Sequence, residues 1–328
     1  MRCGKRNTLT QGGKDVHIAI IEPLGVDERL VHELMGQLDG CTYEYYTERS
    51  VDQQVLARRA KGADVIVVAN APVSKTVLEA APDLRMLSVA FTGLDHIDIA
   101  YCEEHGVKVV NCGGYATEAV AEEVFGLVLA LYRNLLECDR RSRNGGDRGG
   151  LDFRELRGKT LGLVGNGAIA CRVMELARAF GMRLLCHARD ERPIEGVAYV
   201  SLDELCAKSD VLSIHVPSVP GTFHMIGAGQ IALMKPTAIL VNTARGPIVD
   251  TDALVAALEE GRIAGVGLDV LDAEPPFDPD LPILHAPNTV IAPHIGFATQ
   301  EALDARAHMA IDHVREFLAK DEFLGDGK

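Results

Sequence analysis

The stretch GKTLGLVGNGAIACRVMELARAFGMRLLCHARD, residues 158–190, decides the fold of this chain. An apolar run typical of a buried strand leads into a glycine-rich turn and a helical pattern, and a second apolar run follows. Gly165, Gly167 and Ala170 form the pattern G-x-G-x-x-A where strand meets helix. In this context the pattern predicts a dinucleotide-binding loop. Gly165 permits the tight turn, Gly167 lets a pyrophosphate approach the backbone, and Ala170 allows close helix packing.

The start of that helix predicts the phosphate contacts, and the end of the second strand predicts which dinucleotide binds. Backbone N–H groups of the first turn, at Ala168 and Ile169, are expected to face the phosphates. An NAD site normally has a carboxylate at the end of the second strand, but Ala188 and Arg189 stand there. A guanidinium suits a 2′-phosphate, so the sequence favours NADP over NAD. Two alternatives stay open: a turn without a ligand, and an NAD site in which Asp190 supplies the carboxylate.

The rest of the chain alternates short apolar runs with helical patterns, in one series before residue 115 and another from residue 158. This alternation predicts parallel sheets with crossover helices, and a chain of 328 residues has room for two such α/β units. The helical stretch at 116–136 is apolar around most of its circumference, which predicts a linker that also forms a subunit interface. The last amphipathic helix, from about residue 299, has no strand after it and is expected to return to the first unit.

Composition excludes several classes of partner. The formal net charge is −14, with 47 acidic against 33 basic side chains, so nucleic acid and membrane surfaces are poor partners. No apolar run reaches the roughly 18 residues of a membrane span. The amino-terminal stretch predicts a frayed tail rather than a signal peptide, and we expect a cytoplasmic protein without bound metal. The cysteines show no C-x-x-C pair and are interpreted as reduced thiols, at positions 3, 41, 102, 112, 138, 171, 186 and 206.

Three polar residues each follow a strand-like run: Arg245 in VNTARGPIVD, Glu274 in LDVLDAEPP and His294 in IAPHIGFAT. Reduction of a 2-keto acid requires a fixed cation for the carboxylate, an acid for the carbonyl oxygen, and a group that keeps that acid charged. Taken singly, these residues also fit a cation that neutralises strand-end carbonyls, a solvated loop acid and a hydrogen-bonded strand-end histidine. Taken together, they predict one proton-transfer and anion-binding site.

From about residue 60 to 300 the chain resembles the D-isomer-specific 2-hydroxyacid dehydrogenases. The likeness rests on ordered blocks that include SVAFTGLDHIDI, NCGGYATEAVAEEVFGLVLALYRN, the glycine-rich loop, SDVLSIHVPSVPGTFHMI and the three motifs just quoted. It implies two Rossmann- or flavodoxin-like, doubly wound parallel-sheet domains with an active-site cleft between them. The substrate domain would comprise residues 1–115 and 296–328, and the dinucleotide-binding domain residues 116–295. From the apolar circumference of the helix near 117–136 we also expect a homodimer formed through it.

The resemblance assigns roles in hydride transfer between a nicotinamide and a 2-keto or D-2-hydroxy acid. Arg245 would bind the substrate carboxylate and polarise the keto oxygen, His294 would be the general acid or base, and Glu274 would hydrogen-bond the far imidazole nitrogen. Asp269 would accept a hydrogen bond from the nicotinamide carboxamide, unless it merely ends a buried strand. The loop Phe91, Thr92 and Gly93 would cradle the carboxylate through its N–H groups, unless it is a tight turn. Further cofactor contacts are expected at Thr117, His215, Val216, Pro217, Thr243 and Ala244.

Two departures from the family pattern leave the specificity open. Ala188 puts NAD preference in doubt. Phe91 stands where many members have a small residue, which favours either a small substrate or one with an apolar side chain. Two other functions fit the same motifs: a phosphite-type dehydrogenase and a dinucleotide-sensing corepressor. A formate-type enzyme fits less well, because that family has Gln where Glu274 stands.

Overall fold

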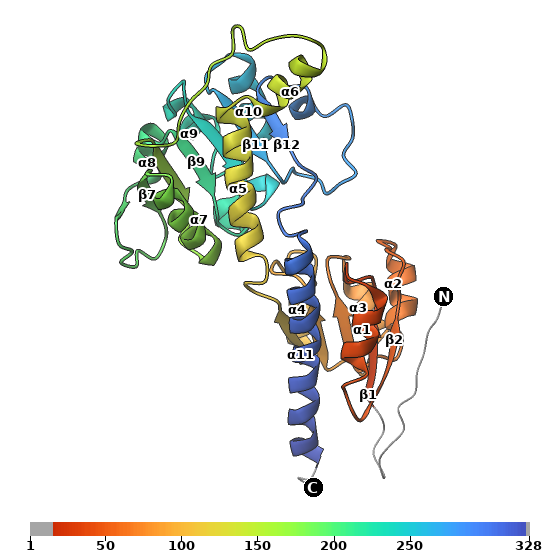
Figure 1. Cartoon of the computed structure of the whole chain (residues 1–328). Helices are drawn as coiled ribbons and strands as arrows, with labels where there is room; N and C mark the ends of the chain where they lie inside the picture. Colours follow the sequence, from red (N-terminus) through yellow and green to blue (C-terminus); the bar gives the residue numbers. More distant parts are fainter. Residues whose placement is uncertain (1–15, 326–328) are drawn as a thin grey trace. The chain divides into compact units, whose positions relative to one another are not determined.

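The computed structural model describes residues 16–325, with side chains described to residue 320. The chain divides into two compact units, shown in Figure 1. The described residues up to Tyr115 and from Thr299 onward form the first, and Ala116–Ala298 form the second. The return to the first unit therefore comes three residues later than the boundary at 295/296 expected from the sequence. The amino-terminal stretch expected to be a tail, with Cys3, lies outside the described residues.

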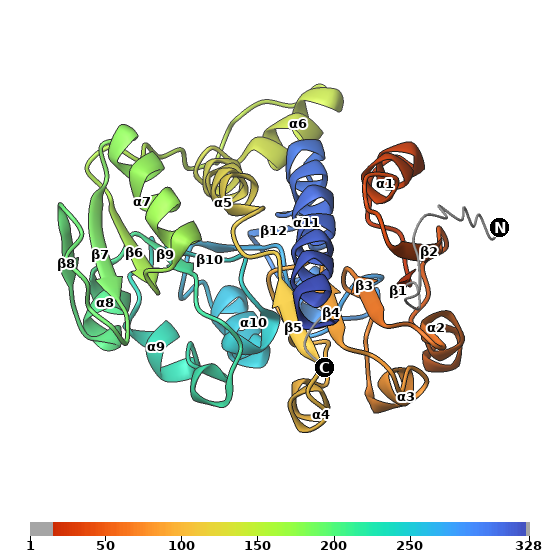
Figure 2. The same cartoon turned by 90° about the horizontal axis from the view of Figure 1, so that it is seen from below.

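The first unit is a five-stranded parallel sheet in the order β2-β1-β3-β4-β5. Figure 2 shows α1 and α11 on one face of this sheet and α2, α3 and α4 on the other. Strands covered on both faces are continuously apolar, as in the fully buried run VIVV of β3. The elements are β1 Val16–Ile20, α1 Glu28–Met35, β2 Cys41–Tyr45, α2 Gln53–Ala60, β3 Val65–Val68, α3 Lys75–Glu79, β4 Met86–Val89, α4 Ile99–Glu104, β5 Lys108–Asn111 and α11 Gln300–Gly325.

The last helix packs on this first sheet. Ala307, Ala310, Ile311 and Val314 are fully buried in the core of the first unit. The hydroxyl of Ser88, in β4, donates a hydrogen bond to the Ala310 carbonyl at 2.9 Å. The carboxyl-terminal helix is therefore part of the first unit's core.

A buried carboxyl group fixes the point in the first sheet where the strand order reverses, between β1 and β3. Glu22 follows β1, is 1% exposed, and accepts hydrogen bonds from the N–H groups of Ala69 and Ala71 at 2.8 and 2.7 Å. Burial raises the pKa of Glu22 above its ordinary value. The loop that follows β3 is thus tied to the end of β1.

The second unit is a seven-stranded parallel sheet in the order β12-β11-β10-β9-β6-β7-β8. Figure 2 shows α5 and α7 on one face and α8, α9 and α10 on the other. The predicted α/β class with two doubly wound parallel sheets is confirmed. The elements are α5 Thr117–Tyr132, α6 Leu135–Arg143, β6 Thr160–Val164, α7 Ala168–Ala179, β7 Arg183–His187, β8 Val197–Tyr199, α8 Leu202–Lys208, β9 Val211–Ile214, α9 Ala228–Leu233, β10 Ile239–Asn242, α10 Thr251–Glu259, β11 Gly265–Leu268 and β12 Thr289–Ile291.

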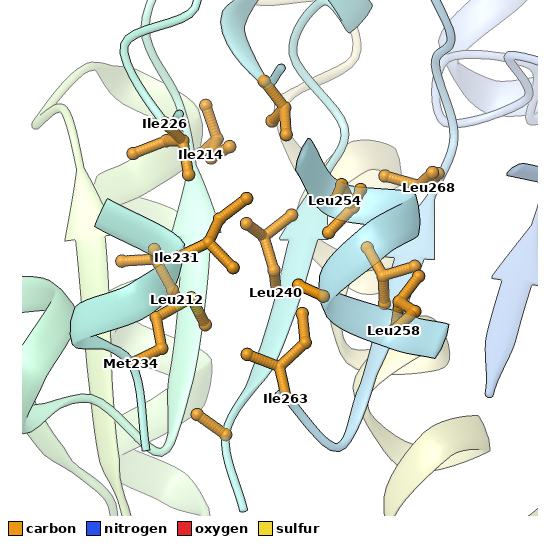
Figure 3. Packing of buried hydrophobic residues seen from close by; sticks show 14 of the residues in the cluster. Leu212, Ile214, Ile226, Ile231, Met234, Leu240, Leu254, Leu258, Ile263 and Leu268 are labelled. Atoms are coloured by element: carbon orange, nitrogen blue, oxygen red, sulfur yellow. The ribbon is translucent and has the colours of Figure 1, made fainter. Parts of the chain in front are cut away.

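The core of the second unit lies on both faces of this sheet. Figure 3 shows Leu212, Leu240 and Leu268, from three neighbouring strands, packing against the side chains of α9 and α10. On the other face, α5 packs so closely that a Cβ at Gly267 would lie 2.9 Å from the Cβ of Leu127. Packing inside its own unit therefore accounts for much of the apolar circumference of α5.

Two sequence expectations concern the whole chain. No helix in residues 16–325 is long and apolar enough to cross a membrane. Seven of the eight cysteines lie in the described part, and each is a free thiol.

Candidate active site

The glycine-rich loop follows β6 and has a specific use for each glycine. Gly165 has φ 104°, and a Cβ there would lie 2.5 Å from the His215 carbonyl oxygen, so a side chain would be excluded. Gly167 is the N-cap of α7, and a Cβ on it would meet no atom within 4 Å. Ala170, in the first turn of α7, is fully buried. The loop thus combines a tight turn, an open approach to the helix N-terminus and close helix packing.

This loop lies where the strand order of the second sheet reverses, between β6 and β9, which is where doubly wound sheets bind ligands. His215 and Val216 follow β9 and pack against Gly165. The His215 ring shares a 2.8 Å hydrogen bond with the Ser213 hydroxyl, and burial lowers the pKa of His215 to about 4. The ring is therefore neutral at pH 7. Pro217 is exposed in the turn that follows.

Asn242, which is not among the predicted site residues, shapes the loop after β10. Asn242 is 1% exposed; its amide donates to the Arg245 carbonyl at 2.8 Å and accepts from the Ala244 N–H at 3.0 Å. The Thr243 hydroxyl is buried and has no hydrogen-bond partner in the described part of the chain. The sequence feature that could have indicated this role is an asparagine at the end of the otherwise apolar strand β10. We call the two hydrogen bonds of the Asn242 side chain the Asn242 clamp. They fix the backbone of Ala244 and Arg245, and so set the direction in which Arg245 leaves the sheet.

Arg245 is half-buried and extended, with φ −149° and ψ 140°, and its guanidinium donates to the Ala244 carbonyl at 2.7 Å. The next residue lies directly against the chain that follows β11. A Cβ on Gly246 would overlap the Leu271 carbonyl group and lie 2.5 Å from the Asp272 nitrogen. The segment with Arg245 is therefore held against the start of the loop that leads to Glu274.

The structure brings His294 and Glu274 together. The Nδ1 atom of His294 lies 2.7 Å from Glu274 Oε2, and the imidazole is 12% exposed whereas the Glu274 side chain is 62% exposed. Phe297 presents its ring edge-on to the imidazole, with 5.5 Å between ring centroids. His294 has φ 58°, a left-handed conformation that an L-residue with a bulky side chain seldom adopts. The surrounding loop must therefore hold it.

Asp269 holds that loop. Its backbone carbonyl accepts from the His294 N–H at 2.8 Å. Its carboxylate accepts from the N–H groups of Ile295 and Gly296 at 2.6 and 2.9 Å, and the residue is 1% exposed. Three consecutive backbone amides are thus bound to one residue at the end of β11. Both carboxylate oxygens of Asp269 therefore accept hydrogen bonds from this loop.

The end of β7 carries the residues expected to choose between NAD and NADP. The Arg189 side chain is 93% exposed, and its guanidinium lies 3.5 Å from the carboxylate of Asp190, which is 84% exposed. Arg192 donates to the Asn166 carbonyl of the glycine-rich loop, and Asn166 donates back to the Asp190 carbonyl at 2.8 Å. The loop after β7 is therefore tied to the glycine-rich loop, with Arg189 pointing into solvent.

The remaining predicted positions are distributed over both units. Thr117 is the first residue of α5 in the second unit. In the first unit, Phe91 is 7% exposed and packs edge-on against His96, with 6.1 Å between ring centroids. Thr92 is exposed; its carbonyl accepts from the Asn111 side chain at 2.6 Å. The Phe91 ring thus belongs to the packing of its own unit.

Known proteins agree with this architecture. The family model for the NAD binding domain of D-isomer specific 2-hydroxyacid dehydrogenases matches residues 125–296. This chain belongs to that family. A glyoxylate reductase of Thermococcus litoralis is 39% identical over 281 residues, covering 82% of this chain and 84% of the relative. The dehydrogenase is therefore an NAD(P)-dependent oxidoreductase of D-2-hydroxy acids, as the sequence predicted.

Two solved structures show which nucleotides this fold accommodates. The D-lactate dehydrogenase of Aquifex aeolicus, complexed with NAD and lactic acid, has a TM-score of 0.80 at 33% identity and covers 93% of this chain and 96% of its own. An acyclic imino acid reductase complexed with NADPH and D-Arg has a TM-score of 0.85 at 30% identity, covering 93% and 98%. This dehydrogenase offers the open approach at Gly167 and the buried Thr243 hydroxyl, which fit a dinucleotide.

The contact at Gly246 gives a test of how Arg245 is positioned. Gly246→Ala forces a methyl group into the backbone of Leu271, so we expect a loss of about 1–3 kcal/mol in the free energy of unfolding and a fall in kcat/KM. Urea unfolding and steady-state kinetics measure both. Gly229→Ala is the matched control, because that glycine lies in α9 with no atom within 4 Å of the added Cβ. Equal effects of the two substitutions would contradict this account of the loop.

Proposed function

We propose that this dehydrogenase reduces a 2-keto acid to the D-2-hydroxy acid, with His294 as the proton donor and Arg245 as the carboxylate-binding cation. The hydrogen bond of 2.7 Å between His294 Nδ1 and Glu274 carries the proposal. A carboxylate on Nδ1 orients the ring, directs Nε2 away from Glu274, and stabilises the positive charge that the ring carries before it gives up its proton. Oxidation of the hydroxy acid is the reverse, with His294 as the base.

Arg245 suits the anionic end of the substrate. Its guanidinium is permanently charged, planar and matched to a carboxylate. The Asn242 clamp and the close packing of Gly246 fix the backbone on both sides of it. The loop Phe91 to Gly93, whose N–H groups the family resemblance assigns to the same carboxylate, stays a prediction.

The chain's own residues would hold the cofactor around the switch point of the second sheet. When bound, the nicotinamide supplies or accepts the hydride. The amides of Gly167, Ala168 and Ile169 at the start of α7 would bind the pyrophosphate, since helix N-termini attract anions. Neutral His215 would add no charge beside it. The other proposed contacts are Gly165, Thr117, Val216, Pro217, Thr243, Ala244 and Asp269.

The substrate we propose is a small 2-keto acid. Curated relatives include glyoxylate reductases and a glycerate dehydrogenase of Methylorubrum extorquens, which is 36% identical over 285 residues. Glyoxylate and hydroxypyruvate are the first compounds to test.

We propose NADP as the preferred dinucleotide. Ala188 stands where NAD sites normally have a carboxylate, so this position is uncharged. The exposed Arg189 guanidinium is next to it. A bidentate bond to a 2′-phosphate would compete with its long contact to Asp190.

We also propose a homodimer formed through residues 117–136. Leu135 and Leu136, at the start of α6, are 52% and 60% exposed, and two adjacent exposed leucines suit a protein contact. A hollow of about 800 Å³ lies beside them, lined by α5, α6 and the amino ends of β10 and β12. It lies at the opposite end of the strands from His294, so we assign it to assembly rather than chemistry.

Removal of the proton donor tests the reaction. His294→Ala should lower kcat by about 10²- to 10⁴-fold while the cofactor Kd changes little, because the nucleotide-binding loop is untouched. The assay pairs glyoxylate, hydroxypyruvate, pyruvate, branched and aromatic 2-keto acids with NADH and NADPH. His285→Ala is the control, since His285 is exposed in the same unit away from this site. Cofactor binding without turnover of any acid would favour a corepressor-like role instead.

A separate variant tests the preference for NADPH over NADH. Arg189→Ala should raise the KM for NADPH by about 10- to 100-fold, the loss expected for one charged hydrogen-bonding group, and leave the KM for NADH within about twofold. Arg183→Ala, at the other end of β7, should change neither value. The same increase with both cofactors would refute a 2′-phosphate contact.

The oligomeric state is measured by sedimentation velocity. The wild-type chain should sediment as a dimer, and Leu135→Asp with Leu136→Asp should shift it to the monomer, because buried unpaired charge opposes association. Val51→Asp, which changes an exposed residue of the first unit, should leave the dimer intact. A wild-type chain that sediments as a monomer at every protein concentration measured would contradict the proposed dimer.

A further inference from the structure

A second carboxyl group lies behind the loop that carries His294. Glu123 belongs to α5, and both of its carboxyl oxygens are buried. A Cβ placed on Gly296 would overlap Glu123 Oε2 and lie 3.0 Å from Asp269 Oδ2. The carboxyl groups of Glu123 and Asp269 therefore converge on one backbone position, two residues after His294.

Two carboxyl groups buried together cannot both carry a charge at low cost. Asp269 is the better site for the charge, because it accepts the Ile295 and Gly296 N–H groups at 2.6 and 2.9 Å. In the described residues no donor reaches either carboxyl oxygen of Glu123, and the group that it meets is the Asp269 carboxylate. Burial, together with the charge of Asp269 and the hydrogen bond to it, raises the pKa of Glu123 to about 8. At pH 7 Glu123 is thus the protonated partner and donates to Asp269.

We propose that Glu123 is a positioning residue: its carboxylic acid donates a hydrogen bond to Asp269, and this pair fixes the backbone of Ile295 and Gly296 and thereby the imidazole of His294. The proposal rests on the proton-donor role proposed for His294. His294 has a φ of 58°, which costs free energy and persists only where neighbouring groups hold the backbone. The hydrogen bonds to Asp269 supply that restraint, and Glu123 keeps the Asp269 carboxylate in place.

Charged side chains on the helices that pack against α5 have partners of their own. On α7, Arg172 binds Glu118 and Glu175, each at 2.7 Å. On α6, Glu137 is bound by the arginines of its own helix. The strands β10, β11 and β12, which pack under α5, contain no ionisable side chain within their bounds. In the described part of the chain, the charge that acts on Glu123 is that of Asp269.

Ionisation of Glu123 has a defined consequence. Loss of its proton removes the hydrogen bond and places two negative charges against each other beside Gly296. The repulsion acts on the segment that holds His294 in place. Catalysis should therefore weaken as the pH rises through the range in which Glu123 ionises, even in the direction that requires an unprotonated His294.

The test measures hydroxy-acid oxidation as a function of pH. In this direction wild-type kcat should fall above a pH of about 8 as Glu123 ionises. Glu123→Gln keeps a donor that does not ionise, so the alkaline fall should disappear. Glu123→Ala should lower kcat by about 10- to 100-fold at every pH, as expected for a displaced catalytic group, with little change in the cofactor Kd. Glu122→Gln, the exposed neighbour on the same helix, is the matched control and should behave as wild type.

A second measurement does not depend on turnover. The NMR signals of the His294 ring should show the alkaline transition in the wild type and lack it in Glu123→Gln. If Glu123→Ala does not fold, the Gln variant decides alone: retention of the alkaline fall and of the NMR transition overturns the proposal. If His294→Ala retains wild-type kcat, the proposed function itself fails. A wild-type kcat in Glu123→Ala while His294→Ala is inactive overturns only the role of Glu123.

Discussion

The hydrogen bonds from three consecutive amides to Asp269 hold the loop on which the proposed chemistry depends. They join the backbone of His294, Ile295 and Gly296 to the end of β11. Because β11 and β12 are parallel neighbours, their carboxyl ends lie at the same edge of the sheet, and the chain leaving β12 can reach Asp269 directly. A histidine with a φ of 58° is tolerated there because the backbone on its carboxyl side is fixed.

The sequence was sufficient for prediction where residue spacing alone determines the geometry. Gly165, Gly167 and Ala170 serve one turn and one helix, so their roles follow from local backbone and packing requirements. The contact between His294 and Glu274 was expected from the family motifs, and parallel strands bring these two loops to the same edge. A doubly wound fold was predictable for the same reason: the alternation of apolar runs and helices leaves few other topologies.

What escaped prediction depends on contacts between distant segments. Glu123 stands beside Glu122 in an apolar helix, and only the docking of α5 on the sheet decides that Glu123 meets Asp269 while Glu122 faces solvent. The apolar circumference of α5 suggested a subunit interface, yet the close approach of Leu127 to Gly267 uses part of it internally. Arg189 is the opposite case: its side chain is almost fully exposed, so the fold does not fix where it points.

The buried acids also bear on how an anionic substrate can bind to a chain with a net charge of −14. At the end of β11, Asp269 has its charge balanced by two backbone amides, and Glu123, with its pKa raised to about 8, is proposed to keep its proton at pH 7. Neither therefore contributes the full field of an unpaired carboxylate beside the half-buried guanidinium of Arg245. The Glu274 carboxylate is largely exposed, and it is bound to the His294 imidazole. The segments after β10 and β12 thus bring the permanent cation of Arg245 and the His294 imidazole to the same edge of the sheet, a charge pattern that suits a 2-keto carboxylate.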